Sequence, residues 1–268
     1  MIGKLPSTFL TALAGLTFAA ASSPAAIVVF DSPQGPPQTP AEFYTAAANG
    51  DAARLDEYLR AGVNANAPLP SPPPAPLSDA INPRNLAGLL LRQGGATPLM
   101  FAVTSRQSAA IAALLAAGAN REAATRAGWR PLDIAAAQND IAGMQQILGV
   151  QPGSDAAALR IDVSLAEQRA TLSRAGITVL TTEISSGRPD KPTPPGTYVV
   201  TQKYKDWRST LYHNASMPWF LRLSCGAVGL HAGYLPGHAA SHGCMRLPPI
   251  MAKRFYDLTP LGTVVVIR

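Results

Sequence analysis

The 268-residue chain is poor in cysteine, histidine, aromatic residues and charge: it has two cysteines, four histidines, 6% aromatic and 14% charged residues. No stretch interleaves aromatic with basic residues, so nucleic acid is not an expected partner. Beyond the amino-terminal segment, no apolar run is long enough to cross a membrane. Alanine-rich stretches and 25 prolines indicate small-residue helices joined by stiff linkers rather than a fibrous or disordered chain. The length allows two modest domains.

Charge is divided unevenly along the chain. Residues 1–155 carry 9 basic and 10 acidic residues, whereas residues 156–268 carry 13 and 6, which gives net charges of −1 and +7. A basic surface suits nucleic acid, anionic lipid or an anionic cell-wall polymer equally well. A solvated surface with a mild excess of arginine explains the same numbers.

The amino-terminal segment is typical of an export signal. Lys4 precedes an apolar run of 13 residues, Phe9–Ala21, which is followed by small residues. Such a run is short for a bilayer-spanning helix but fits a secretory signal. We therefore expect a signal peptide at 1–26, a linker at 27–40, and a periplasmic or cell-envelope location with no stable membrane span after cleavage. An uncleaved anchor is the open alternative. No cysteine follows the run, so a lipoprotein anchor is not indicated.

An internal repeat occupies the middle of the chain. Thr97-Pro98-Leu99 and Arg130-Pro131-Leu132 begin two similar segments 33 positions apart, and the sequence ending at Asn64 resembles the one ending at Asn120. A Thr-Pro-Leu pattern with this period resembles the ankyrin repeat, in which each unit is a helix pair closed by a glycine. We expect about three all-α units over residues 41–150. Such an array either binds a protein partner or only positions the second domain.

A proline-rich insertion interrupts the repeat. Ala46 and Ala102 hold equivalent positions but stand 56 residues apart, about 23 more than one period. The surplus lies at about residues 67–95 and opens with a dense proline run, which cannot continue a helix. The segment Asp79–Gln93 is predicted to add a short helix.

The densest chemistry lies between His231 and Arg246. These sixteen residues hold three of the four histidines and Cys244. A cysteine close to imidazoles is a candidate nucleophile, because a histidine can take the thiol proton and later return it to a leaving amine. Zinc binding by His238, His242 and Cys244, a disulfide between Cys244 and Cys225, and chance are the alternatives. Cys225, in a strand-like run, otherwise reads as a buried structural thiol.

The same residues carry a family resemblance. Ser241-His242-Gly243-Cys244-Met245-Arg246, with Leu230-His231-Ala232-Gly233 upstream, resembles the signature of the L,D-transpeptidases, the YkuD-like catalytic domain. Three further segments are similar to other parts of that domain: Ile161–Arg169, Pro194–Tyr198 and Met217–Phe220. The resemblance covers residues 157–268.

A mainly β domain is predicted for the same part of the chain. Apolar or β-branched runs predict strands at 161–165, 197–202, 221–223 and 262–267, and Pro249 opens a helix that ends near Asp257. The resemblance implies a mixed β-sheet with the cysteine on a loop at one edge. The predicted fold class is therefore two-domain: an all-α ankyrin repeat array followed by a mainly β L,D-transpeptidase catalytic domain.

The resemblance also implies roles for individual residues. Cys244 would be the nucleophile and His231 the general base and later acid, although His231 and His242 could exchange roles. His242 and Ser241 would line the site, and the backbone amides of Gly243 and Cys244 would form an oxyanion hole.

One basic and two aromatic side chains complete the expected site. Arg246 would bind a substrate carboxylate or hold the loop through carbonyl contacts. Tyr234 and Trp219 would face the substrate or be packed, and His238 has no assigned role. No metal or other cofactor is required.

The family's substrate is the peptidoglycan stem peptide. The resemblance implies a thioester formed with loss of D-alanine from a tetrapeptide donor, and transfer to an amine of a neighbouring stem to give a 3→3 cross-link. Water as the acceptor would make the enzyme an L,D-carboxypeptidase or amidase. A binding protein led by the ankyrin array, with an inactive cysteine domain, is the alternative of another class. Cys244 follows His231 by thirteen positions, a shorter spacing than in the longer-loop members of the family, and no cell-wall-binding repeat is evident.

Overall fold

The computed structural model describes residues 41–73 and 86–268, which belong to one compact unit. The predicted signal peptide and linker, and residues 74–85 of the proline-rich insertion, lie outside the described residues. Within the described part, no helix is both long and apolar enough to cross a bilayer.

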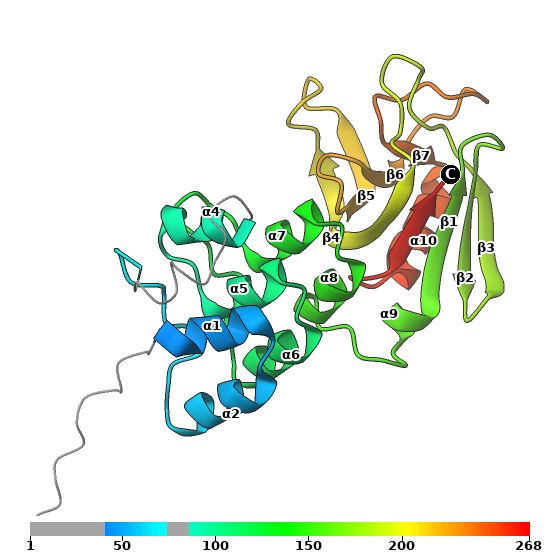
Figure 1. Cartoon of the computed structure of the whole chain (residues 1–268). Coiled ribbons are helices and arrows are strands. Elements are labelled where there is room, and N and C mark those ends of the chain that lie inside the picture. Colours follow the sequence, from blue (N-terminus) through cyan, green and yellow to red (C-terminus); the bar gives the residue numbers. More distant parts are fainter. Residues whose placement is uncertain (1–40, 74–85) are drawn as a thin grey trace, which may run out of the picture. The chain divides into compact units, whose positions relative to one another are not determined.

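Helices alone make up the first half of this unit (Figure 1). The short helices α1 and α2, α5 and α6, and α7 and α8 follow one another as pairs, and contacts run from α1 to α5 to α7 and from α2 to α6 to α8. The helix predicted at Asp79–Gln93 is present as α4 over Leu86–Gln93. The helices are α1 (Ala41–Asn49), α2 (Ala52–Arg60), α4, α5 (Pro98–Thr104), α6 (Ser108–Ala116), α7 (Pro131–Ala137), α8 (Ile141–Ile147) and α9 (Asp155–Ala158).

The turns inside the three helix pairs repeat the same geometry. Gly50, Arg106 and Asn139 all have positive φ angles, of 77°, 54° and 50°. The residue after each one donates its backbone N–H to the carbonyl five positions earlier, as in the 2.9 Å bond from Gln107 to Ala102. The predicted helix pairs are therefore present at the predicted spacing, and the ankyrin assignment stays a prediction.

Equivalent asparagines connect two of the units. The side-chain oxygens of Asn64 and Asn120 each accept a hydrogen bond from the backbone N–H two residues on, at 2.8 and 2.9 Å. Asn66 bridges the units, because it accepts from the backbone of Asn120 at 2.6 Å and donates to Gly118 at 3.1 Å. Unsatisfied backbone groups between the pairs are thus bonded by side chains of the neighbouring unit.

Large apolar residues form the core of the helical array. Phe43, Tyr44 and Phe101 are fully buried, and their rings meet edge to face. The Tyr44 hydroxyl donates to the carbonyls of Ala67 and Pro68 at 3.1 and 3.0 Å, which fixes the start of the proline-rich insertion against α1. Burial raises the pKa of Tyr44 to about 12, so it stays a donor at neutral pH.

An eight-stranded mixed sheet makes up the second half, in the order β3-β2-β1-β8-β4-β5-β6-β7. The pairs β1–β8 and β6–β7 are parallel and the others antiparallel. All four predicted strand segments are present. The strands are β1 (Leu159–Ser164), β2 (Arg169–Arg174), β3 (Ile177–Glu183), β4 (Gly196–Arg208), β5 (Ser216–Leu223), β6 (Gly229–Ala232), β7 (Met245–Leu247) and β8 (Val264–Ile267).

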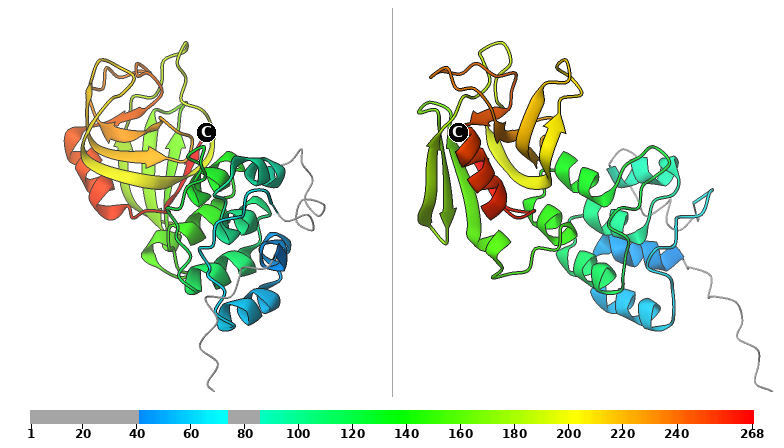
Figure 2. Two further views of the ribbon diagram at one scale, coloured as in Figure 1. Left: turned by 90° about the vertical axis from the view of Figure 1, so that its left-hand side faces the viewer. Right: turned by 180° about the vertical axis from the view of Figure 1, so that it is seen from behind.

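The long strand β4 connects the two parts of this sheet. Its first residues pair with β8 and the rest pair with β5, so it belongs to both parts (Figure 1). The predicted helix is α10, Pro249–Leu258, which contacts β5, β6 and β7 (Figure 2). Alternation along β1 places Ile161 and Val163 in the core below α10 together with Phe255. The far edge of the sheet, β7, begins directly after Cys244.

Candidate active site

Two short parallel strands set the frame of the candidate site. Strand β6 is buried along its whole length, and His231 pairs in register with Arg246 of β7. The loop of residues 233–244 connects these strands and returns the chain to the sheet edge at Cys244. The predicted histidine and arginine are therefore neighbours on adjacent strands, and the cysteine precedes the second strand by one residue.

A cavity of about 260 Å³ brings most of the predicted site residues together. Six of the seven predicted site residues line it, and Gly243 is the one that does not. The lining residues are Ser209, Tyr212, Ala215, Ser216, Met217, His231, Ala232, Gly233, Tyr234, Ser241, His242, Cys244 and Arg246.

His231 is held in one tautomer by its own backbone neighbour. Its Nδ1 lies 2.7 Å from the carbonyl oxygen of Ala232, which can only accept, so Nδ1 carries the proton and Nε2 is unprotonated in the neutral ring. The side chain is only 7% exposed. Burial, and to a smaller extent the nearby Arg246, lowers the pKa of His231 to about 4, against an opposing effect of the Ala232 carbonyl. The ring is therefore neutral at pH 7.

The thiol of Cys244 lies in a half-buried position. Burial raises the pKa of Cys244, while the backbone of Gly229 and the cations Arg222 and Arg246 oppose that rise. The Sγ atom lies 3.5 Å from the carbonyl oxygen of Ala227, in the connection between β5 and β6. The resting group is accordingly a thiol that needs a base before it can attack a carbonyl.

Ser241 shapes the turn in front of the cysteine. Its hydroxyl accepts the backbone N–H of Gly243 at 3.1 Å and donates to the carbonyl of Cys244 in a short hydrogen bond. Gly243 has a φ of 120°, in the region that favours glycine. The expectation that the Gly243 amide is a free oxyanion donor is therefore not met, because Ser241 already occupies it.

A second loop, residues 184–195, supports this turn from below. The carbonyl of Ser186 accepts the backbone N–H groups of Ala240 and Ser241, and the Thr193 hydroxyl donates to the Gly243 carbonyl at 2.8 Å. Ser186 is itself fixed by Gln168, through a 2.9 Å bond from its backbone and a 2.8 Å bond to its side chain. The position of Cys244 thus depends on a chain of hydrogen bonds that starts at the turn after β1.

The remaining predicted residues lie farther from the thiol chemistry. The exposed His242 ring faces Tyr212 with the ring centroids 4.5 Å apart, and Tyr234 is 79% exposed at the cavity rim. Trp219 packs on α10, 5.4 Å from the Tyr256 ring, so it is a packed rather than a substrate-facing residue. The His238 side chain is exposed, and only its carbonyl is used, by Ser185 at 2.8 Å.

Comparison with known proteins shows that the part of the chain that contains this site is similar to one family. The sequence profile of the YkuD L,D-transpeptidase catalytic domain matches residues 158–267. These residues are therefore similar to an L,D-transpeptidase catalytic domain. A relative, YciB of Bacillus subtilis (strain 168), whose own L,D-transpeptidase assignment is provisional, is 32% identical over 124 residues, which cover 40% of this chain and 64% of the relative.

Solved structures of L,D-transpeptidases are similar to part of this chain. One from Mycobacterium smegmatis is 21% identical with a TM-score of 0.40, and covers 41% of this chain and 58% of its own. One from Mycobacterium tuberculosis H37Rv is 24% identical with a TM-score of 0.39, and covers 41% and 57%. The chain thus spans less than two thirds of the length of these relatives.

Several residues of the L,D-transpeptidase domain's cavity escaped the sequence analysis. Ser209 and Tyr212 come from the β4–β5 connection and Ser216 begins β5, and all three reach the cavity only through the fold. Met217 belongs to a segment that resembles the family, and this resemblance was the one feature of the sequence that pointed to this side of the cavity. Arg222 was not noted at all, although it lies close enough to Cys244 to affect its charge state.

The L,D-transpeptidase domain offers no cluster for the zinc alternative. Across residues 41–73 and 86–268, no group of three histidine, cysteine or acidic side chains is placed to hold a metal ion. Cys225 and Cys244 are both free thiols, so the disulfide alternative is not formed in this structure. Burial raises the pKa of Cys225 to about 11, as expected for a structural thiol.

Proposed function

We propose that the chain is a cysteine-dependent L,D-transpeptidase that acts on peptidoglycan stem peptides in the cell envelope. The observation that carries this proposal is the shared cavity of Cys244 and a neutral His231 whose free Nε2 can accept a proton. A nucleophile beside a base with a fixed tautomer is the arrangement that acyl transfer requires. The match of residues 158–267 to the L,D-transpeptidase domain supports the same reaction class.

The reaction proceeds through a thioester. His231 Nε2 takes the Sγ proton as the sulfur attacks the peptide carbonyl, because the raised pKa of Cys244 disfavours a resting thiolate. The C–N bond then breaks, and the same proton passes from His231 to the leaving amine, D-alanine in a tetrapeptide donor. An amine of a second stem attacks the thioester and loses a proton to His231. The C–S bond then breaks and His231 returns the proton to Sγ, which leaves a 3→3 cross-link, the free thiol and a neutral imidazole. Water in place of the amine would give carboxypeptidase or amidase activity.

Neighbouring groups orient these steps. The Cys244 backbone N–H serves as the oxyanion donor, since the Gly243 amide is bonded to Ser241. The backbone of Arg246 is fixed by two bonds with Ser185, at 2.9 and 3.0 Å, so its side chain is assigned to a substrate carboxylate in the cavity rather than to holding the loop. His242 and Tyr234 form the exposed rim that a peptide meets first.

The helical array has a supporting role in this proposal. We assign its helix pairs to the ankyrin type on the basis of the repeated turns and the equivalent asparagines. Gln145 of α8 donates to the Gly262 carbonyl at 3.0 Å, immediately before β8, so the array is bonded to the enzyme domain. Its outer face is then available to a protein partner.

The test is intact-mass analysis of the purified protein with a carbapenem. The strained β-lactam carbonyl is open to attack by a reactive thiolate, so a mass increase of one ligand is expected on the native chain. Cys244→Ala should abolish the adduct, and the matched variant Cys225→Ala should keep it. An adduct that persists in Cys244→Ala, or none on freshly reduced native protein, would refute the proposal.

A further inference from the structure

Cys244 also faces a second, smaller cavity. This cavity has a volume of about 80 Å³ and lies on the β4–β5 hairpin side of the thiol. It shares Ser209, Tyr212, Met217, His242 and Cys244 with the larger one. The lining residues are Trp207, Ser209, Thr210, Leu211, Tyr212, Met217, Arg222, Ala227, Val228, His242 and Cys244.

Arg222 is the one arginine or lysine of this lining, and no acidic residue accompanies it. Its guanidinium lies 4.8 Å from the Trp207 ring centroid and 5.3 Å from that of Phe220. These two rings are themselves stacked at 6.1 Å. An arginine held against two aromatic faces has lost most of its rotational freedom, so it is pre-organised for a ligand.

The hydrogen-bonding capacity of Arg222 is largely unused. One Nη donates to the Gly226 carbonyl at 3.2 Å, whereas the buried Nε has no partner among the described residues. No ion pair within residues 41–73 and 86–268 includes Arg222. A half-buried guanidinium whose Nε is buried and unpaired, and which has no carboxylate partner, favours binding of an anion.

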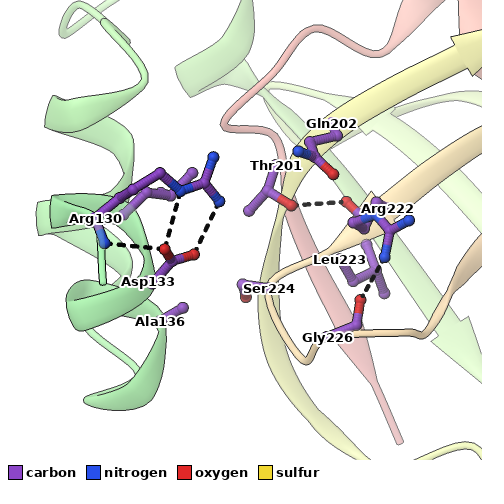
Figure 3. Close-up of a pocket in the computed structure, with 10 residues that line it drawn as sticks. Arg130, Asp133, Ala136, Thr201, Gln202, Arg222, Leu223, Ser224 and Gly226 are labelled. Carbon is purple, nitrogen blue, oxygen red and sulfur yellow. Dashed lines mark hydrogen bonds and ion pairs between the residues drawn. The ribbon is translucent and has the colours of Figure 1, made fainter. Parts of the chain in front are cut away.

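The acidic side chain that lines the cavity on the other side of Arg222 is paired with another arginine. Arg222 also borders a cavity of about 260 Å³ that includes Arg130 and Asp133, shown in Figure 3. Asp133 is bound to Arg130 by two hydrogen bonds of 2.9 and 3.0 Å, and the dashed lines of Figure 3 connect it to Arg130 only. The positive charge of Arg222 therefore remains available to the thiol side.

We propose that Arg222 binds a carboxylate of the second, amine-bearing substrate in the cavity of about 80 Å³ beside Cys244. This inference rests on the proposed function, which needs two peptides on either side of one sulfur. The larger cavity contains Arg246 and suits the donor, and the smaller contains Arg222 and has room for an end group only. A guanidinium and a carboxylate match as a planar, charge-assisted pair.

The first experiment compares two alkylating agents on the full chain. Iodoacetate and iodoacetamide react with the same thiolate, but only iodoacetate carries a carboxylate. The ratio of their rates at Cys244, followed by mass analysis of the peptide that contains it, therefore reports carboxylate recognition independently of the thiol's pKa. The variants are Arg222→Gln, Arg222→Lys and, as a matched control, Arg254→Gln on the exposed face of α10.

The proposal predicts a lower iodoacetate-to-iodoacetamide ratio in Arg222→Gln, by about tenfold, since a hydrogen bond to a charged group is lost. Arg222→Lys keeps the positive charge but lacks the planar guanidinium, so its rate ratio should lie between that of Arg222→Gln and that of the native protein. Arg254→Gln should match the native ratio. An unchanged ratio in Arg222→Gln overturns the assignment, whether or not the protein forms a carbapenem adduct.

A second measurement identifies which substrate is bound. With a stem tetrapeptide as donor, the amine acceptor is a D-amino acid or its carboxamide, and KM and kcat are determined for both. Arg222→Gln should raise the KM of the carboxylate acceptor about tenfold and leave that of the carboxamide unchanged. Equal effects on both acceptors would overturn the assignment, whereas loss of the carbapenem adduct in native protein would refute the proposed function instead.

Discussion

The helical array and the L,D-transpeptidase domain are stabilised by contacts of different range. In the array, each helix pair meets its neighbours in sequence, through repeated turns and through asparagines one unit apart. In the enzyme domain, Ser185 pairs with Arg246 and Gln168 holds Ser186, so distant segments meet at the cysteine. Substitutions in the array should therefore change stability, whereas substitutions near Cys244 should change chemistry.

The comparison is sharpest at His231. Replacing His231 by Gln removes the base, and the rate of carbapenem acylation should fall by about 10²- to 10⁴-fold. Stopped-flow or mass-resolved acylation kinetics measure the effect. His238→Gln, at an exposed side chain, is the control and should react at the native rate. If His238→Gln were the slow variant instead, the base would have been assigned to the wrong imidazole.

A core substitution in the array should lower stability and leave the acylation rate unchanged. Leu114 is fully buried in α6, and Leu114→Ala should lower the free energy of unfolding by about 3 kcal/mol through lost burial and a cavity. The half-buried neighbour Leu115→Ala should cost less. Urea unfolding measures both, and acylation at 20 °C should stay near the native rate. A parallel loss of acylation would show that the array contributes to the site.

Lowering the pH should destabilise the enzyme domain through His231, and all four histidines of the chain lie in that domain. The pKa of buried His231 is lowered to about 4, so between pH 6.5 and 4 the unfolded state binds a proton that the folded state does not. Stability is complete above pH 6.5 and falls as the pH is lowered, in total by about 3 kcal/mol. Urea titrations at four pH values, beside His231→Gln, should show this loss in the native protein only.

The smallest expected effect lies in the loop that supports the cysteine. A Cβ on Gly187 would lie 2.2 Å from the Lys191 carbonyl oxygen, so Gly187→Ala must displace the backbone and should cost about 1–3 kcal/mol. Thermal unfolding measures the cost, and Cys244 alkylation should slow with it. Gly237→Ala, which meets no atom within 4 Å, is the comparison at a positive φ. Equal alkylation rates in Gly187→Ala and native protein would remove this loop from the positioning of the thiol.

Features that depend on residues close in sequence could be predicted from the sequence, whereas features that depend on distant segments could not. The helix pairs were predictable because their signals repeat along the chain, and α10 because Pro249 opens it. Cys244, His231 and Arg246 were predictable because they are close in sequence. Arg222 was not, since it reaches the cysteine only through the pairing of β5 with its neighbours. Ser186 and Thr193 were not, since hydrogen bonds of a loop far away in sequence bring them there. The occupied Gly243 amide was likewise unpredictable, because a side chain two residues away competes for it.

The placement of β8 has a consequence for the order of folding. Strands β1 and β4 do not pair with each other, and β8 (Val264–Ile267) is the strand that pairs with both of them. Arg160 pairs with Val264 across more than a hundred positions of chain, a closure that is entropically costly and slow. Without β8, no strand pairing connects the β1–β2–β3 part to the β4–β5–β6–β7 part, and the bonds of the loop 184–195 to residues 240–246 are what connect them. We therefore expect the two parts of the sheet to join late in folding, after the contacts within each part have formed.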